Sequence, residues 1–180
     1  MKTYLLLLRG INVGGKNKVS MAQLRIHLEK LGYTNVSTYI NSGNVIVSSD
    51  KKPEKIKAEI EALLPRAFQL DSEFIKILVL SQAQLQAVVD DKPKGFGDQP
   101  DIYYCDVLFL MDISVDDAMS IFDPRDGVDK IWPGVGVVYS QRLGAERTKS
   151  RLSKIIGSPL YKSMTIRSWN TTSKLLSLLG

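Results

Sequence analysis

The residues best able to do chemistry lie in one glycine-rich segment near the start of the chain, Arg9-Gly10-Ile11-Asn12-Val13-Gly14-Gly15-Lys16-Asn17-Lys18. Its glycines let the backbone turn sharply and leave amide N–H groups uncovered, as in an anion-binding nest. The helix expected after Ser20 adds the positive end of its dipole. A charged tight turn without a ligand is the alternative interpretation. The candidate anion-binding residues are Arg9, Asn12, Gly14, Gly15 and Lys16.

The same segment satisfies most of the phosphate-loop pattern G-x-x-x-x-G-K-[ST] through Gly10, Gly15 and Lys16. The next residue is Asn17, so the hydroxyl that binds magnesium is missing. The expected helix also begins too late, and the surrounding elements do not predict a parallel sheet. These departures exclude a nucleotide triphosphatase.

Three further segments carry candidate ligand-binding residues. Asn41 opens the turn Asn41-Ser42-Gly43-Asn44, although a hairpin turn alone also explains these residue types. Lys149 flanks an expected helix start, where an anion is favoured and a solvated basic face is the alternative. The junction Arg167-Ser168-Trp169-Asn170 adds Arg167, Trp169 and Asn170. The simpler explanation is that Trp169 is a core residue and Asn170 a helix cap. Arg167 is not explained in this way, because a charge at the end of a buried strand needs a partner.

The net charge of +5 is unevenly distributed along the 180 residues. Residues 1–20 hold four basic and no acidic side chains, and residues 141–170 carry a net charge of +6. Residues 90–130 carry a net charge of −7. Because the basic segments coincide with candidate anion sites, we expect a phosphate-bearing ligand or a nucleic-acid backbone as the partner.

Composition excludes several classes of chemistry. The chain has one histidine, His27, and one cysteine, Cys105, so no internal disulfide and no Cys/His zinc spacing is possible. We expect neither a metal nor a cofactor. The apolar run Tyr4–Leu8 is far too short to cross a bilayer. A cytoplasmic protein with no membrane partner is therefore expected.

The elements that must position these residues repeat one order, β-α-β-β-α-β followed by a helix. In the first half the predicted strands are Lys2–Arg9, Val36–Ile40, Val45–Ser48 and Phe74–Leu80, with helices beginning after Ser20, at Pro53 and after Ser81. In the second half the strands are Tyr103–Met111, Val128–Trp132, Val135–Ser140 and Met164–Arg167, with helices Ser114–Phe122, Arg147–Ile156 and one capped by Asn170.

This order predicts an α+β protein made by internal duplication of a ferredoxin-like unit with an antiparallel sheet. The expected units are residues 1–90 and 103–180, joined by a linker at 91–102. In the first unit we expect the turn at Asn41 to lie at the opposite end of the sheet from the glycine-rich loop. The loop and the turn are then not expected to meet.

The candidate segments together resemble the bacterial domain of unknown function 1697 family. The resemblance is carried by the segment from Arg9 to Val19, the Tyr39-Ile-Asn-Ser-Gly-Asn-Val hairpin, the helix start at Arg147 and Lys149, and Thr165-Ile-Arg-Ser-Trp-Asn-Thr. The family's last motif usually reads Arg-Asn-Trp-Asn-Thr, and Ser168 departs from it. The resemblance implies a cytosolic α+β protein and names candidate residues without naming a reaction.

Three function classes are compatible with these observations. We expect a non-catalytic module that binds a phosphate-bearing ligand through basic, glycine-rich loops. A small phosphohydrolase of the acylphosphatase type is an alternative by analogy of fold, with Arg9 or Lys16 and Asn41 as its residues. A protein-interaction module is a third. RNA binding on the sheet surface is not expected, because the Val45–Ser48 strand offers no aromatic side chain and the first strand offers only Tyr4.

Overall fold

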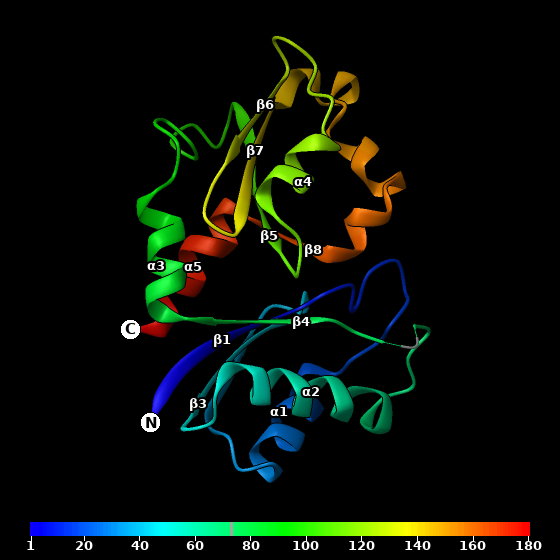
Figure 1. Ribbon diagram of the computed structural model, residues 1–180, viewed down its shortest axis with the longest axis vertical. Coiled ribbons are helices and arrows are strands. Elements are labelled where there is room, and N and C mark those ends of the chain that lie inside the picture. The colour runs from blue at the N-terminus through cyan, green and yellow to red at the C-terminus, as the bar shows by residue number, and fades with distance from the viewer. Residues whose placement is uncertain (73) are drawn as a thin grey trace. The chain divides into compact units, whose positions relative to one another are not determined.

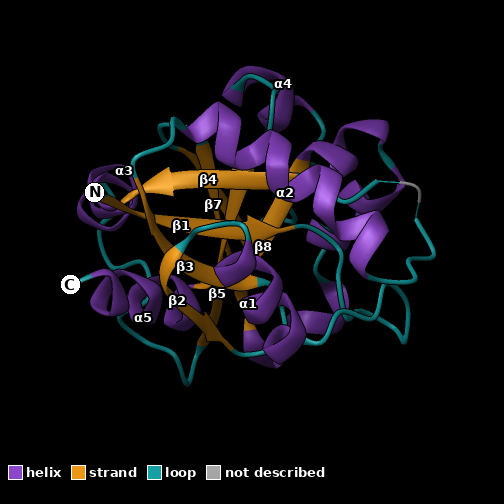
Figure 2. Ribbon diagram, turned by 90° about the horizontal axis from the view of Figure 1, so that it is seen from below, coloured by secondary structure: helices purple, strands orange, loops and turns teal. Residues whose placement is uncertain are grey.

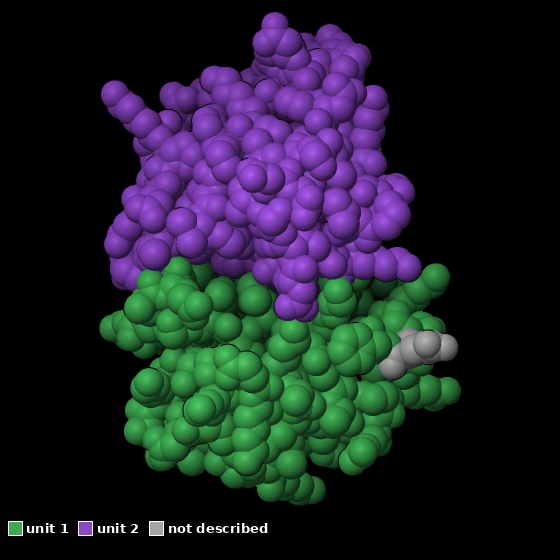
Figure 3. All heavy atoms as spheres, viewed as in Figure 1, with its two compact units in different colours: residues 1–85, 175–180 green, residues 86–174 purple. Residues whose placement is uncertain are grey.

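The structure, a computed structural model, describes residues 1–72 and 74–180. The chain divides into two compact units, coloured separately in Figure 3. Unit 1 comprises Met1–Leu85 and Leu175–Gly180, and unit 2 comprises Gln86–Lys174. Each unit is built on a four-stranded antiparallel sheet (Figure 1). The predicted α+β class with two ferredoxin-like sheets is confirmed.

Unit 1 follows the order β-α-β-β-α-β. Its elements are β1 (Lys2–Leu8), α1 (Met21–Lys30), β2 (Thr34–Tyr39), β3 (Asn44–Ser49), α2 (Pro53–Ala67) and β4 (Ile77–Ser81), followed by α3 (Gln82–Asp90). The sheet order is β2-β3-β1-β4, the ferredoxin-like arrangement. Figure 2 shows α1 and α2 in front of β1 and β3, so both helices cover one face of this sheet.

The core of unit 1 explains why its strands and helices form where they do. The apolar run Leu5–Leu8 is fully buried in β1, at the centre of the sheet. Leu24 and Leu28 of α1 join the core cluster on one helical face, four residues apart. The Ser20 hydroxyl accepts a hydrogen bond from the Gln23 N–H at 3.3 Å and so caps α1 as predicted. The loop between β1 and α1 is therefore anchored at both ends by buried elements.

Unit 2 is built in the same strand order. Its elements are β5 (Tyr103–Leu110), α4 (Val115–Ser120), β6 (Asp129–Pro133), β7 (Val137–Leu143) and β8 (Met164–Ser168). The helix α5 (Trp169–Leu179) begins in unit 2, and its residues from Leu175 onward belong to unit 1. The sheet order is β6-β7-β5-β8. Leu108, Val138 and Met164 from three of these strands form one core cluster with Ala118 of α4 and Ile155.

The helix predicted over Arg147–Ile156 is wrong. Three short 3-10 helices connect β7 to β8: η1 (Gly144–Lys149), η2 (Leu152–Gly157) and η3 (Pro159–Ser163). Between η1 and η2 the Arg151 N–H donates to the Asp129 carboxylate at 2.8 Å rather than to a helical carbonyl. Ser150 and Ser158 each accept a hydrogen bond from the backbone N–H two residues later. These side-chain contacts interrupt a continuous helix.

Candidate anion-binding site

The glycine-rich loop and the β2–β3 turn of unit 1 meet. In the antiparallel pair of β1 and β3, Leu7 lies opposite Asn44, so the turn that leads into β3 lies where β1 ends. The Asn12 side-chain Nδ2 donates to the Asn41 carbonyl at 2.8 Å. The prediction that loop and turn occupy opposite ends of the sheet is wrong, because an antiparallel neighbour begins where β1 finishes.

Gly43 holds the turn against the base of the loop. The Leu8 N–H donates to the Gly43 carbonyl at 2.8 Å. Gly43 has a φ of +87°, and a Cβ atom there would lie 2.8 Å from the Leu8 Cβ. The close approach of the two backbones therefore requires glycine at this position.

The backbone of the loop is strongly curved. Five of its residues have positive φ angles: Gly10 (69°), Asn12 (53°), Gly14 (57°), Gly15 (77°) and Asn17 (48°). The Asn12 N–H donates to the Asn17 carbonyl at 3.0 Å, which closes the loop on itself. Gly14 and Gly15 are exposed, and neither amide donates a hydrogen bond to any described residue. Successive uncovered N–H groups in a tight turn can form a concavity of the kind that favours an anion.

Asn12 positions the loop. Its Oδ1 accepts from the Val19 N–H at 2.9 Å, and its Nδ2 donates to the Val19 carbonyl at 2.9 Å as well as to Asn41. Because both polar atoms of the side chain are engaged by the protein, the structure gives Asn12 the role of joining the two ends of the loop to the turn.

Asn17 was missed as a site residue by sequence reasoning. Its buried side chain accepts from the backbone N–H groups of Asp71 and Ser72 at 3.0 and 2.9 Å. Its Nδ2 donates to the Gly10 carbonyl at 3.0 Å and to the Ser72 hydroxyl at 2.9 Å. The available clue was its residue type, since asparagine tolerates a positive φ better than most residues. Asn17 fixes the loop to the segment before β4.

A broad, open hollow of about 540 Å³ lies beside the loop. The residues that line it are Asn12, Gly15, Lys18, Val19, Ser20, Met21, Ala22 and Asn41. Met21 and Ala22 form the first turn of α1, whose amides have no partner within the helix. Uncommitted amides, a helix N-terminus and the exposed Lys18 thus surround one space, which has the chemistry of an anion site.

The predicted residues of unit 1 therefore divide into two groups. Asn12, Gly15 and Asn41 line the hollow, and Lys18 joins them. Lys16 and Gly14 are exposed on the same loop without lining it, and Arg9 is half-buried at its start. The Asp71 carboxylate accepts the Asn17 N–H at 2.6 Å, so this acidic group is engaged by the loop backbone.

In unit 2, Lys149 and Arg167 bind groups of the protein itself. The Lys149 Nζ lies 2.6 Å from the Glu146 carboxylate, one turn away in η1. Arg167 is buried in β8, and its Nη1 donates to the Thr165 hydroxyl at 2.9 Å and to the Ile166 carbonyl at 2.8 Å. Burial lowers the pKa of Arg167 to about 10, so it remains charged at neutral pH.

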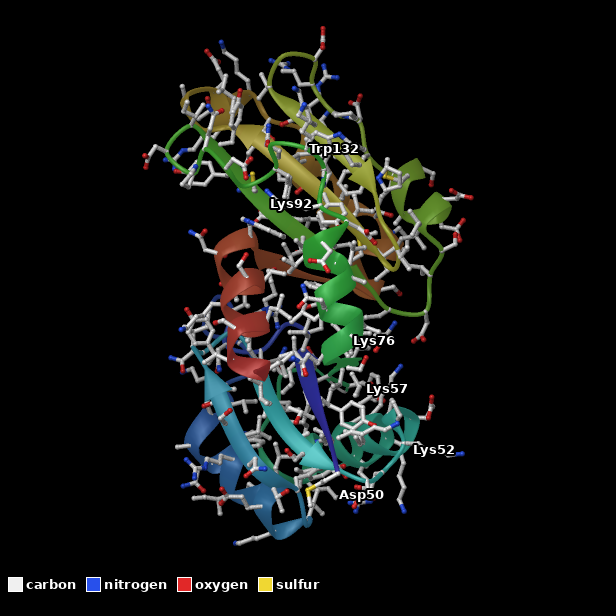
Figure 4. The ribbon with its side chains drawn as sticks, turned by 90° about the vertical axis from the view of Figure 1, so that its left-hand side faces the viewer. Asp50, Lys52, Lys57, Lys76, Lys92 and Trp132 are labelled. Carbon is white, nitrogen blue, oxygen red and sulfur yellow. The ribbon has the colours of Figure 1, made fainter. Side chains whose placement is uncertain are left out.

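Trp169 belongs to an aromatic cluster in unit 2. The Phe96 ring contacts Trp132, Tyr139 and Trp169 edge to face, with ring centroids 5.3 to 6.0 Å apart. Lys92 lies over the Trp169 ring, 5.7 Å from its centroid; Figure 4 labels Lys92 and Trp132. Trp169 and Asn170 also border a hollow of about 200 Å³ together with Tyr104 and Cys105.

The cap of α5 differs from the prediction. Ser168, not Asn170, precedes the helix, and its hydroxyl accepts a hydrogen bond from the Thr171 N–H at 3.2 Å. Asparagine caps a helix about as well as serine does. This explains why serine replaces the usual asparagine of the Arg-Asn-Trp-Asn-Thr motif.

The capping role predicts a difference between two substitutions of Ser168. Ser168→Ala should lower the free energy of unfolding by about 1 kcal/mol, because the Thr171 N–H loses its acceptor. Ser168→Asn should leave it unchanged within about 0.5 kcal/mol. Urea unfolding of both variants measures the two values, and equal losses would contradict a cap.

The described residues show neither a metal-ligand cluster nor a membrane-spanning helix. In that part of the chain, no group of three or more His, Cys, Asp or Glu side chains could hold a metal ion. No helix that the structure describes is long and apolar enough to span a bilayer.

Comparison with known proteins places the chain in a family. The profile of a protein family of unknown function, DUF1697, matches residues 1–139. The chain belongs to the DUF1697 family. A solved structure, that of the conserved bacterial protein SP0830 from Streptococcus pneumoniae, is similar to this DUF1697 protein with a TM-score of 0.84 and 28% sequence identity. The similarity covers 99% of each chain. No curated protein is a significant match.

Proposed function

We propose that this protein binds a phosphate-bearing ligand, without transforming it, at the β1–α1 loop of unit 1. The observation that supports this most is the hollow beside the loop, where the Gly15 backbone, Lys18 and the first turn of α1 converge. Each of these groups favours an anion for a different physical reason: an uncovered amide, a positive charge and a helix dipole. The ligand's phosphate occupies the mouth of the loop.

The framework around the hollow supports binding of a defined ligand rather than a general attraction of anions. Asn12 and Asn17 hold the loop in its curved conformation through seven side-chain hydrogen bonds. A preorganised site spends less free energy on ordering itself when the ligand arrives. The hollow of about 540 Å³ is also of the size that small-molecule sites have.

The proposal predicts that Lys18→Gln weakens the binding of phosphate compounds at least about tenfold, because a charge-assisted hydrogen bond is lost. Lys52→Gln is the matched control. Lys52, labelled in Figure 4, is exposed and follows β3, whose end pairs with the beginning of β1 rather than with the loop. Calorimetric titration with pyrophosphate and with a nucleoside monophosphate measures both variants. Equal affinities of Lys18→Gln, Lys52→Gln and the unaltered protein would contradict the proposal.

The salt dependence of binding separates two sources of phosphate. A single-stranded oligonucleotide that contacts several lysines and arginines gives a slope of several units in a plot of log K against log salt. A mononucleotide carries no condensed counterion atmosphere to release, so its slope is much smaller. We expect the mononucleotide result, because the amides and Lys18 surround one space.

Hydrolysis of an acyl phosphate at the same loop is a second candidate function. It is favoured by one observation: Asn41 lies beside the loop, and its side-chain amide makes no hydrogen bond with a described residue. An amide so placed can orient a water molecule toward a bound phosphate. Turnover of acetyl phosphate that is lost in Asn41→Ala would support this function, and no turnover at high protein concentration would exclude it.

A further inference from the structure

One face of the unit 2 sheet carries a row of polar side chains inside an otherwise apolar surface. In the register of the sheet, Asp106 of β5 pairs with Ser140 of β7 and with Ser168 of β8. Arg142 lies two residues beyond Ser140 on β7, opposite Tyr104. Since paired residues and residues two apart point to the same face, these side chains share one side of the sheet.

A cavity of about 230 Å³ opens on this face. The apolar part of its wall comes from β5, β8, η2 and the segment after α4: Leu108, Phe122, Leu152, Ile155, Ile156 and Ile166. Ser153 and Tyr161 also line it. Asp106, Ser140 and Arg142 form its polar end. The cavity is smaller than the ~300–1,000 Å³ of typical drug-sized sites. A ligand about the size of one amino acid fits it.

The polar end holds two charged groups whose hydrogen-bonding capacity is unused. Asp106 makes no hydrogen bond and no ion pair with a described residue, and burial raises the pKa of its carboxyl against the opposing effect of Arg142. The Arg142 Nε is buried without a hydrogen-bond partner among the described residues. Asp106 is half-buried and its carboxyl is available to a ligand, whereas the buried Arg142 Nε without an acceptor costs free energy that a complementary ligand would recover.

A second acidic residue, Asp129, lies near Arg142 but forms no hydrogen bond or ion pair with its guanidinium. Asp129 of β6 lies opposite Arg142, but one of its oxygens accepts the backbone N–H groups of Arg125 and Arg151 at 3.0 and 2.8 Å. The Asp129 Oδ2 is thereby committed to the loops around β6, whereas its buried Oδ1 has no hydrogen-bond partner among the described residues, and Arg142 contributes to holding the pKa of this carboxyl below its usual value. The cavity itself presents one carboxyl and one guanidinium.

We propose that this cavity binds a free α-amino acid with an apolar side chain. Its ammonium group pairs with Asp106, its carboxylate pairs with Arg142, and its side chain lies against Leu108, Ile155 and Ile166. A simple carboxylic acid would place a second negative charge beside Asp106, and a simple amine would place a second positive charge beside Arg142. Like charges in a partly buried site repel, so neither half of the amino acid suffices alone.

Binding of an amino acid in this cavity is tested first with a series of ligands and the unaltered protein. Calorimetric titration with L-leucine, 4-methylpentanoate and 3-methylbutylamine compares the zwitterion with analogues lacking the ammonium or the carboxylate. We expect leucine to bind at least about tenfold more tightly than either analogue. Equal affinity of all three would show an apolar cavity without charge recognition, and no binding of leucine, valine or phenylalanine at 10 mM would also overturn the proposal.

Two substitutions assign the charged partners. Asp106→Asn should reduce the preference for leucine over 4-methylpentanoate, and Arg142→Gln should reduce the preference for leucine over 3-methylbutylamine. Asp126→Asn is the control, because Asp126 is exposed in unit 2 and does not line the cavity. Preferences that stay unchanged in both cavity variants, with folding verified by circular dichroism, would contradict the assignment.

Discussion

Replacing Asn17 by alanine should destabilise unit 1 by about 3 kcal/mol and abolish phosphate binding at the loop. Alanine with a positive φ costs about 1 kcal/mol relative to asparagine. Removing the side chain also breaks its four hydrogen bonds with Gly10, Asp71 and Ser72. These three residues are exposed, so water partly replaces the lost partner, and we expect about 0.5 kcal/mol for each bond. The loop then loses its attachment to the segment before β4.

Asn35→Ala is the matched control for this change. Asn35 also has a positive φ, 49°, but it is exposed and donates a single side-chain hydrogen bond, to the Ser48 hydroxyl. The conformational cost is therefore the same, and the difference between the variants isolates the Asn17 hydrogen bonds. Both tryptophans lie in unit 2, so hydrogen exchange of unit 1 amides is the suitable measurement. Equal losses of protection in the two variants would contradict the bracing role of Asn17.

Replacing Gly97 by alanine should destabilise unit 2 by about 3 kcal/mol, since overpacking costs ~1–3 kcal/mol and a positive φ adds about 1. Gly97 has a φ of +77°, and a Cβ atom there would overlap the Cδ1 and Nε1 atoms of Trp169. The indole must move, and it then loses its contacts with Phe96 and Lys92.

Gly95→Ala separates the two contributions. Gly95 has a φ of +80°, and a Cβ atom there would meet no heavy atom within 4 Å. This control carries the backbone cost without the clash. Tryptophan fluorescence during urea unfolding reports on unit 2 and on the Trp169 environment. We expect a shifted native emission spectrum in Gly97→Ala alone, and a native spectrum unchanged in both variants would show that Trp169 does not lie on Gly97.

The strands of both sheets could be predicted because their apolar runs end at glycine, asparagine and proline. Leu5–Leu8 is a buried central strand in the structure, as its continuous apolar character indicates. The meeting of the loop with Asn41 was predictable in principle from strand direction alone. It was missed because the turn was assigned to the wrong end of the sheet, not because the residues were ambiguous.

Other features depend on contacts that sequence patterns do not show. The Arg147–Ile156 segment forms 3-10 helices because the Arg151 N–H is taken by Asp129, a residue from another strand. The cap of α5 is Ser168, two residues earlier than the predicted Asn170. In each case a local hydrogen bond from a side chain decides between structures of nearly equal propensity.

The unit 2 cavity was also absent from the sequence-based hypothesis. Asp106 and Arg142 lie on strands far apart in the chain and meet on one face only through the register of β5 and β7. One clue was present in the sequence. Asp106 interrupts the otherwise apolar strand predicted over Tyr103–Met111, and a carboxyl in a buried strand requires an explanation. The two proposed sites thus lie in different units and differ in chemistry.

The proposed phosphate site is tested most directly by following backbone amide resonances during titration with inorganic phosphate and then with a nucleoside monophosphate. We expect saturable shifts confined to the amides of the loop and the first turn of α1: Gly14, Gly15, Lys18, Met21 and Ala22. These are the groups that surround the hollow or form the curved loop beside it. The absence of saturable shifts there, or shifts centred on other residues, would contradict the proposed function.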